Sequence, residues 1–257
     1  MITLLQGTTV RRFLSLLLIA LLPIATLVAD DVLRPVTHED VWLMKRLGTP
    51  VVSPNGRFAV VSITGPSYEE EGTVSDLWLI DIGGKNAARR LTASKESESS
   101  VDWSPDGRRI AFSTKRGEDE VNQIYVLNMD GPGEAIRITD IATGAAPPTW
   151  SPDGSRLAFE SRDYPGAADT EANAAEKKAR EERKVNVSAY EMFPIRQWDR
   201  WRDDLQTHLF VQDAKAGAPA TNLLFGSDLV SHPGFGGAES LSGDSLEPAW
   251  TPDGSAV

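Results

Sequence analysis

In the segment from Tyr190 to Trp201, aromatic side chains alternate with charged ones. It reads Y-E-M-F-P-I-R-Q-W-D-R-W, and the proline within it is typical of a loop. This composition suits recognition of a ligand by ring stacking and ion pairing, since cations bind to aromatic faces and loops often carry binding residues. The same side chains also suit a structural role, in which they tie an insertion onto the body of the protein. Both interpretations stay open.

The familiar catalytic patterns are missing from the sequence. The chain has no cysteine, which excludes disulfides, thiol catalysis and cysteine metal ligands within it. His38, His208 and His232 lie far apart and show none of the close spacings of metal ligands. The sequence also contains no Gly-x-Ser-x-Gly elbow, no phosphate-binding glycine loop and no His-Glu-x-x-His pair. We therefore expect no catalytic residue, no metal site and no cofactor in these 257 residues.

Two of the histidines have ordinary structural explanations. His208 is expected to be a partly buried histidine at the start of a strand, beside Thr207. His38, together with Thr37, is expected to cap a short entry helix. His232 lies in a glycine-rich stretch, and nothing in its sequence context indicates a role for it.

One short phrase recurs along the chain and indicates a repeat architecture. Its four copies are Ser53-Pro54-Asn55-Gly56, Trp103-Ser104-Pro105-Asp106-Gly107, Trp150-Ser151-Pro152-Asp153-Gly154 and Trp250-Thr251-Pro252-Asp253-Gly254. Proline presets φ for the second position of a type I turn, and glycine accepts the left-handed conformation that closes a hairpin. The aspartates are expected to accept hydrogen bonds from backbone N–H groups of these turns, rather than to act in acid–base chemistry.

Each of the first three copies of the phrase is followed by two segments that look like strands. The first is a short apolar run of the kind found in buried strands: 58–61, 110–112 and 157–159. The second comes later in the same order: 77–81, 124–128 and 209–213. Each unit is therefore predicted to contain several antiparallel strands.

The spacing of the landmarks supports a propeller. Pro54 to Pro105 is 51 residues, Pro105 to Pro152 is 47, and Trp78 to Tyr125 is also 47. About four strands with their turns fit in that length, which is one propeller blade. The predicted fold is an all-β propeller of four-stranded antiparallel blades, with about three blades and the start of a fourth. Because closed propellers have four to eight blades, we expect an incomplete ring, the front part of a longer protein.

The last interval between phrases is longer and predicts two insertions. Pro152 to Pro252 is 100 residues, and most of the excess lies between the second and third strands of that blade. We place the insertions at about 164–200 and 223–240. Within the first, residues 167–187 are rich in Ala, Glu, Lys and Arg, which favours an exposed helix.

Charge and the N-terminal segment limit the possible functions. The net charge is −11 and no basic stripe is present, so nucleic acid is not an expected partner. Arg11 and Arg12 precede an apolar run over 13–28, and Ala29 is followed by two aspartates. This pattern is typical of a signal peptide over 1–29, while the run is short for a membrane anchor. We expect an exported protein, periplasmic or secreted, whose mature part, 30–257, has no stable membrane insertion.

Three stretches together resemble one family of enzymes. They are the opening segment 36–42 with 52–56, the repeated Trp-Ser-Pro-Asp-Gly phrases, and the segment 190–199 continuing to 208–211. In these the chain is similar to the prolyl oligopeptidase family of serine peptidases, in its exported dipeptidyl-peptidase and acylaminoacyl-peptidase-like branch. The resemblance covers essentially the whole mature chain. Gln197 stands where relatives commonly carry histidine, and Asn55 replaces the aspartate of the other phrases.

The resemblance implies two domains with different functions. In that family an N-terminal propeller covers a C-terminal α/β-hydrolase domain that carries the catalytic triad, and it restricts entry to short peptides. The resemblance thus implies a hydrolase domain outside this chain as partner, and no triad residue within it. It also implies substrate contacts: Glu191 with the free amino group of a peptide, Arg196 or Asp199 with its backbone ends, and Trp198 packing beside them.

A second function fits the repeats equally well. A Tol-type periplasmic propeller uses the same turn phrase and holds a protein partner on its face, without any hydrolase. Whether the full protein prefers dipeptides or acylated residues, and its oligomeric state, are left open by the sequence.

Overall fold

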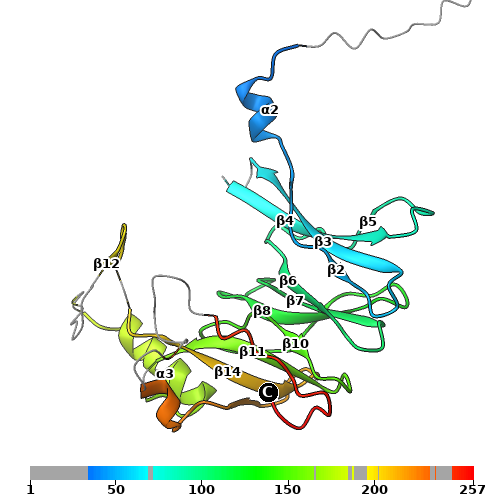
Figure 1. Ribbon diagram of the computed structural model, residues 1–257. Helices are drawn as coiled ribbons and strands as arrows, with labels where there is room; N and C mark the ends of the chain where they lie inside the picture. Colours follow the sequence, from blue (N-terminus) through cyan, green and yellow to red (C-terminus); the bar gives the residue numbers. More distant parts are fainter. Residues whose placement is uncertain are drawn as a thin grey trace, which may run out of the picture. The chain divides into compact units, whose positions relative to one another are not determined.

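The computed structural model describes residues 34–68, 72–164, 166–184, 187, 196–201, 203–231, 235 and 245–257 (Figure 1). The predicted signal peptide lies outside the described residues. The chain divides into two compact units, Met1–Val41 and Trp42–Val257, which are taken in turn. No helix among the described residues has the length and apolar character that crossing a membrane requires.

A short helix, α2 (His38–Trp42), begins at the predicted entry point. The backbone N–H of Asp40 donates to Thr37 Oγ1 at 3.2 Å, and the N–H of Thr37 donates to Asp40 Oδ2 at 2.7 Å. This reciprocal arrangement is a capping box. The helix was therefore predicted correctly but its cap only in part, because Thr37 and Asp40 make the cap while His38 is the exposed first helical residue.

The described part of the second unit contains three large antiparallel sheets in sequence order, besides one two-stranded hairpin (Figure 1). The first contains β1 (Arg46–Leu47), β2 (Val51–Val52), β3 (Phe58–Ser67), β4 (Gly72–Asp81) and β5 (Arg89–Arg90). The second contains β6 (Ser99–Trp103), β7 (Arg109–Thr114), β8 (Gln123–Asn128) and β9 (Ile136–Arg137). The third contains β10 (Thr149–Trp150), β11 (Arg156–Asp163), β14 (Gln206–Asp213) and β15 (Ala220–Asn222).

Each sheet is one blade of a propeller. In the first, β1 and β2 both pair with β3, so this sheet too is four strands wide. The predicted apolar runs fall inside β3, β7 and β11, and the later predicted strands fall inside β4, β8 and β14. The prediction of an all-β propeller with four-stranded antiparallel blades and a short helix is confirmed. We call the sheets blades 1, 2 and 3.

In each blade the repeated phrase forms the turn that leads into the first long strand: β2 to β3, β6 to β7 and β10 to β11. Ser104 Oγ accepts a hydrogen bond from the N–H of Arg109 at 2.9 Å, and the N–H of Gly107 donates to the carbonyl of Ser104 at 2.8 Å. Asp106 Oδ1 accepts from the N–H of Arg108 at 3.0 Å, which confirms the predicted turn role. The other copies repeat these bonds, with Asn55, Asp153 and Asp253 in the place of Asp106.

The core lies between blades rather than within them. One apolar cluster joins blade 1 to blade 2 and includes Val60, Leu77, Trp103, Ile110, Phe112 and Tyr125. A second joins blade 2 to blade 3 and includes Ala111, Ile124, Trp150, Leu157, Phe159 and Phe210. Because a strand sends alternate side chains to opposite faces, each blade buries one face against each neighbour. The blades therefore stabilise one another through consecutive interfaces.

The segment between β11 and β14 contains a helix and a small hairpin. The helix, α3 (Thr170–Glu181), lies within the predicted helical stretch. The hairpin consists of β12 (Arg196–Gln197) and β13 (Arg200–Trp201), so the prediction of a loop was wrong for the described part of 190–201. After β15, a single 3₁₀ turn, η1 (Asp228–Ser231), falls in the second predicted insertion.

Candidate functional site

The β12–β13 hairpin carries three of the four predicted substrate contacts. Arg196 pairs with Trp201 across the hairpin, and its guanidinium carbon lies 5.8 Å from the centroid of that ring. Trp198 and Asp199 form the two-residue turn, where Trp198 adopts φ = 55° and is 90% exposed. A tryptophan in this left-handed region is uncommon and costly. The turn therefore presents an indole ring and a carboxylate to solvent side by side.

The fourth predicted contact, Glu191, lies outside the described residues. The structure thus brings Arg196, Trp198 and Asp199 together at the end of one hairpin and leaves Glu191 unplaced. These three side chains supply a cation, a carboxylate and an exposed aromatic ring, which suit the binding of a ligand. Nothing in the described hairpin provides a nucleophile with a base.

Helix α3 precedes the hairpin and is anchored to blade 3 by one buried amide. Asn173 is 1% exposed, and its Oδ1 accepts from the N–H of Tyr164 at 2.9 Å. Its Nδ2 donates to Thr143 Oγ1 at 2.8 Å and to Asp163 Oδ1 at 3.0 Å. Because the residue sits in the first turn of α3, these bonds fix the start of the helix against blade 3.

The outer part of α3 is held by an arginine. Arg180 donates from Nη1 and Nη2 to the two carboxylate oxygens of Asp204, at 2.6 and 2.9 Å. Its guanidinium carbon also lies 4.3 Å from the centre of the Tyr164 ring. A bidentate pair of this kind fixes orientation as well as distance. The helix therefore has two anchors. Asn173 binds residues that precede the hairpin in the sequence, and Arg180 binds Asp204, which follows it.

A buried polar cluster lies beneath α3, at the end of β11. Asp163 is 1% exposed, and its Oδ2 accepts a hydrogen bond from Asn222 Nδ2 at 2.9 Å. His208 Nδ1 lies 3.8 Å from the same carboxylate oxygen and 2.8 Å from Asn222 Nδ2. Burial raises the pKa of Asp163 to about 7, although the bond from Asn222 acts to lower it. His208 is fully buried, more than the partly buried histidine predicted from the sequence.

The hydrogen bonds of the Asn222 side chain indicate the tautomer of His208. Asn222 Oδ1 accepts from the N–H groups of Leu224 and Phe225, so its Nδ2 must face the imidazole. His208 Nδ1 is therefore assigned as an acceptor and Nε2 as the protonated nitrogen, although Nε2 is buried and has no hydrogen-bond partner among the described residues. Burial lowers the pKa of His208, consistent with a neutral ring. The described part of the chain contains no group of three His, Asp or Glu side chains that could hold a metal ion.

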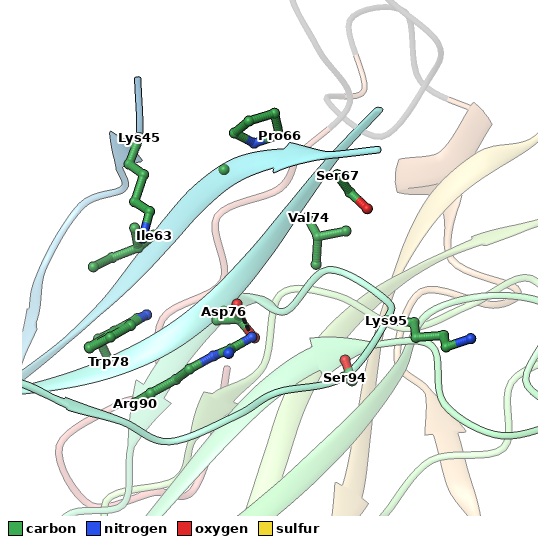
Figure 2. A pocket seen from close by; sticks show the side chains of 11 residues that line it. Lys45, Ile63, Pro66, Ser67, Val74, Asp76, Trp78, Arg90, Ser94 and Lys95 are labelled. Carbon is green, nitrogen blue, oxygen red and sulfur yellow. Dashed lines mark hydrogen bonds and ion pairs between the residues drawn. The ribbon is translucent and has the colours of Figure 1, made fainter. Parts of the chain in front are cut away.

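A hollow of about 350 Å³ lies on blade 1 (Figure 2). It is lined by Lys45, Ile63, Gly65, Pro66, Ser67, Val74, Asp76, Trp78, Arg90, Ser94 and Lys95. Figure 2 shows Asp76 and Arg90 joined by an ion pair; their Oδ2 and Nη2 atoms are 2.6 Å apart. With three basic residues and one acidic residue, the lining suits a carboxylate or another anionic group.

The hollow and the hairpin are separate features, because none of the lining residues comes from 190–201. Sequence reasoning missed the hollow. Its residues come from β3, β4, β5, the segment before β1 and the segment after β5, and none of them follows a recognisable motif. Only the strand pairing, in which Ile63 lies opposite Asp76 and Trp78 opposite Arg90, brings them together.

Comparisons with known proteins agree with this architecture. A family model described as the TolB beta propeller domain matches residues 42–187. Two curated relatives are named dipeptidyl-peptidase 5. The one from Porphyromonas gingivalis is 26% identical over 81 residues, covering 32% of this chain and 12% of the relative. The one from Porphyromonas endodontalis is 32% identical over 78 residues, covering 30% of this chain and 11% of the relative.

Solved structures show the same fold at low sequence identity. The acylaminoacyl peptidase of Pyrococcus horikoshii is 14% identical with a TM-score of 0.50, over 71% of this chain and 25% of that chain. The AtxE2 isopeptidase is 18% identical with a TM-score of 0.50, over 77% of this chain and 34% of that chain. The matches thus span about a tenth of each curated relative and up to a third of these structures. Since the family model covers more than half of the residues, the chain belongs to the TolB beta propeller domain family.

Proposed function

We propose that this chain is the substrate-gating propeller portion of an exported serine peptidase that cleaves short peptides. The observation that carries the proposal is the similarity to two proteins named dipeptidyl-peptidase 5, at 26% and 32% identity. The signal-peptide pattern over 1–29 supports export to the periplasm or the exterior. The catalytic Ser, Asp and His belong to an α/β-hydrolase domain outside these residues, with dipeptidyl-peptidase or acylaminoacyl-peptidase-like specificity.

In this proposal the β12–β13 hairpin contacts the substrate. Arg196 and Asp199 carry opposite charges on one short hairpin, as the two ends of a short peptide do. Trp198 supplies an exposed ring on which a side chain or peptide plane can pack. Glu191 completes the set by meeting the free amino group. Peptide binding therefore uses the propeller, and bond cleavage uses the hydrolase domain.

Substitutions in the full-length protein test the role of the hairpin. Arg196→Ala, Trp198→Ala and Asp199→Ala should each raise KM for short peptide substrates about 10-fold, with kcat little changed, because they remove binding rather than chemistry. Lys215→Ala, an exposed residue in the turn between β14 and β15, is the matched control and should leave KM unchanged. If the three hairpin variants behave like the control, the hairpin has only a structural role.

A protein-binding scaffold of the TolB type is the second candidate. It is favoured by the family match over residues 42–187 and by the two exposed tryptophans of the hairpin, since exposed aromatic residues are enriched at protein interfaces. Labelling of the full-length protein with a fluorophosphonate probe separates the two functions. A serine peptidase forms a covalent adduct at its nucleophile, whereas a scaffold does not react.

A further inference from the structure

Helix α3 is attached to the propeller through polar contacts. Asn173 is its one buried residue, and no apolar side chain of the helix is buried. A helix of 12 residues is marginal by itself, so its position depends on what holds it. Its outer part makes partly exposed ion pairs, from Lys177 to Glu120 at 3.2 Å and from Arg180 to Asp204 at 2.6 Å. Because exposed ion pairs contribute little in water, the buried amide of Asn173 is the principal attachment.

Asn173 is bound in turn to the buried carboxyl of Asp163. Nδ2 of Asn173 donates to Asp163 Oδ1 at 3.0 Å, and Nδ2 of Asn222 donates to Asp163 Oδ2 at 2.9 Å. The side-chain oxygens of both amides accept from backbone N–H groups, so neither amide can turn round without losing these bonds. One carboxyl therefore holds the first turn of α3 and the end of β15 at the same point.

The described side chains that contact this carboxyl carry no positive charge. His208 Nδ1 lies 3.8 Å from Asp163 Oδ2, but it accepts the bond from Asn222, and a proton on Nδ1 would set two donors against each other. β15 and the segment before β10 contribute the neutral side chains of Asn222 and Thr143. The other charged or titratable groups on the surrounding elements bind elsewhere or are exposed: Arg162 and Glu160 of β11, Asp203 before β14, Asp169 and Glu171 at the start of α3, and Arg180 stacked on Tyr164.

Ionisation of Asp163 therefore places an uncompensated charge beneath α3. Burial of such a charge is costly, and this cost raises the pKa of Asp163 to about 7. A protonated carboxyl stays neutral and keeps an oxygen that accepts a hydrogen bond. Water reaches an ionised carboxyl most easily if α3 moves away, because β14 and β15 are paired into the sheet of blade 3 and α3 is not. Detachment of α3 is thus the least costly response to ionisation.

The β12–β13 hairpin depends on the same support. Its described side chains are exposed, and a hairpin with two-residue strands is not stable by itself. The chain that leaves it is held at two consecutive aspartates. Asp203 accepts from Arg162 of β11 at 2.8 Å, and Asp204 accepts from Arg180 of α3 at 2.6 and 2.9 Å. Detachment of α3 removes the second of these two supports.

We propose that Asp163 is a positioning residue for the hairpin: its protonated carboxyl holds α3 on blade 3, and its ionisation releases α3 together with the base of the hairpin. Asp163 does not touch the substrate; it acts through Asn173, α3 and Asp204. This inference rests on the proposed function, in which the hairpin binds short peptides. Peptide binding should then be weaker above neutral pH than below it.

Hydrogen exchange in the full-length protein tests the link between Asp163 and α3. Protection factors, which correct for the intrinsic exchange rate at each pH, are measured for residues 170–181 from about pH 6 to pH 9. In the wild type they should fall about 10-fold per pH unit above 7, because detachment returns the carboxyl to its ordinary pKa. This profile needs no variant, so it decides even where a substitution prevents folding.

Two substitutions assign the effect to one carboxyl. Asp163→Asn has one carbonyl oxygen and one donor group, as the protonated acid does, and its protection factors in α3 should not change with pH. Glu171→Gln is the matched control, because it removes an exposed carboxylate from the first turn of the same helix. It should keep the wild-type dependence on pH.

The pH dependence of KM tests the link to the substrate. The ratio of the wild-type KM to that of Asp163→Asn cancels ionisations in the hydrolase domain. This ratio should rise at least about 3-fold from pH 6.5 to pH 8.5, towards the roughly 10-fold effect expected from loss of a hairpin contact. The ratio of the two kcat values should stay constant, whereas general unfolding of the wild type would lower its kcat and leave KM unchanged.

Each result has a separate meaning. Wild-type protection factors that stay constant above pH 7, or that fall equally in Asp163→Asn, overturn the proposal. Falling protection factors with a constant KM ratio overturn the positioning role. If Arg196→Ala, Trp198→Ala and Asp199→Ala all leave KM unchanged, the proposed function is wrong instead, and the exchange profile still decides whether Asp163 holds α3.

Discussion

Removal of the Arg109 side chain should weaken the contact between blades 2 and 3. Arg109 Nη2 donates to the carbonyl of Gly154 at 2.8 Å, and the guanidinium stacks on Trp150 at 4.5 Å. A hydrogen bond to a charged group contributes about 1.5 to 3 kcal/mol, and a cation–π contact about 0.5 to 1 kcal/mol when partly exposed. Both contacts use one guanidinium and are not fully additive. Arg109→Ala should therefore lower the free energy of unfolding by about 2 to 3 kcal/mol.

The neighbouring arginine provides a control of the same chemistry. Arg108 pairs with Asp130 on the surface, where its side chain is 68% exposed. Surface ion pairs contribute about 0 to 1 kcal/mol, so Arg108→Ala should change stability little. The two variants remove the same atoms from adjacent positions. Any difference between them reports the contact between blades.

Urea unfolding followed by tryptophan fluorescence measures the effect, and Trp150 is itself a reporter at the contact. Hydrogen exchange at the turn between β10 and β11 adds a local measurement, because the same contact should limit opening of that turn. Arg109→Lys should recover only part of the loss, since an ammonium cannot stack as a plane on the indole. If Arg109→Ala and Arg108→Ala agree within about 0.5 kcal/mol, the turn contact does not hold the blades together and the reasoning fails.

Two further predictions concern the cluster under α3. Burial raises the pKa of Asp163 to about 7, above its unfolded value, so its stabilising contribution is complete below about pH 4 and is lost as pH rises through 7. The free energy of unfolding of the wild type, minus that of Asp163→Asn, should therefore fall by up to about 4 kcal/mol from pH 4 to pH 8. Urea titrations at several pH values measure this difference, and a constant difference would contradict the prediction. Asn173→Ala removes three hydrogen bonds and should speed amide exchange in α3 about 10-fold. Glu171→Ala changes an exposed residue of the same turn and should leave amide exchange in α3 unchanged. Equal exchange rates in the two variants would show that Asn173 does not anchor the helix.

Local features of the fold could be predicted from the sequence because their causes are local. The proline, the aspartate or asparagine, and the glycine of each phrase act within five residues, and the observed turn bonds are the expected ones. The entry helix could be placed from Thr37 for the same reason. The hairpin at 196–201 was missed because its strands are two residues long, and an alternation of aromatic and charged residues does not distinguish a short hairpin from a loop.

The polar contacts could not be predicted, because their members meet only through the pairing of strands within a blade or the packing of one blade on the next. Asp163 and Asn222 are 59 residues apart, and Asp102 reaches the N–H of Trp150 across 48 residues. Burial raises the pKa of the half-buried Asp102. The insertion between β11 and β14 separates Asp163 from Asn222 in the sequence, and its length is not set by the repeat.

The two ends of the blades differ in how closely they follow the repeat. At the turn end, the same serine or threonine, proline and glycine recur in all four phrases. At the other end, the position seven residues after that of Arg109 holds Gly65, Arg116 or Asp163 in successive blades. Its surroundings change with it, from an open hollow to a buried ion pair to an amide and histidine cluster.

This contrast indicates where function is to be sought. The turn end is constrained by packing, because each turn supports the next one and a change there disturbs two blades. At the opposite end the residues differ from blade to blade. In blade 3 the chain leaves β11 at this end and continues through α3 to the hairpin that carries Arg196, Trp198 and Asp199. Residues that recognise a substrate or partner must differ from one propeller to another, so they belong at the end that the repeat leaves variable.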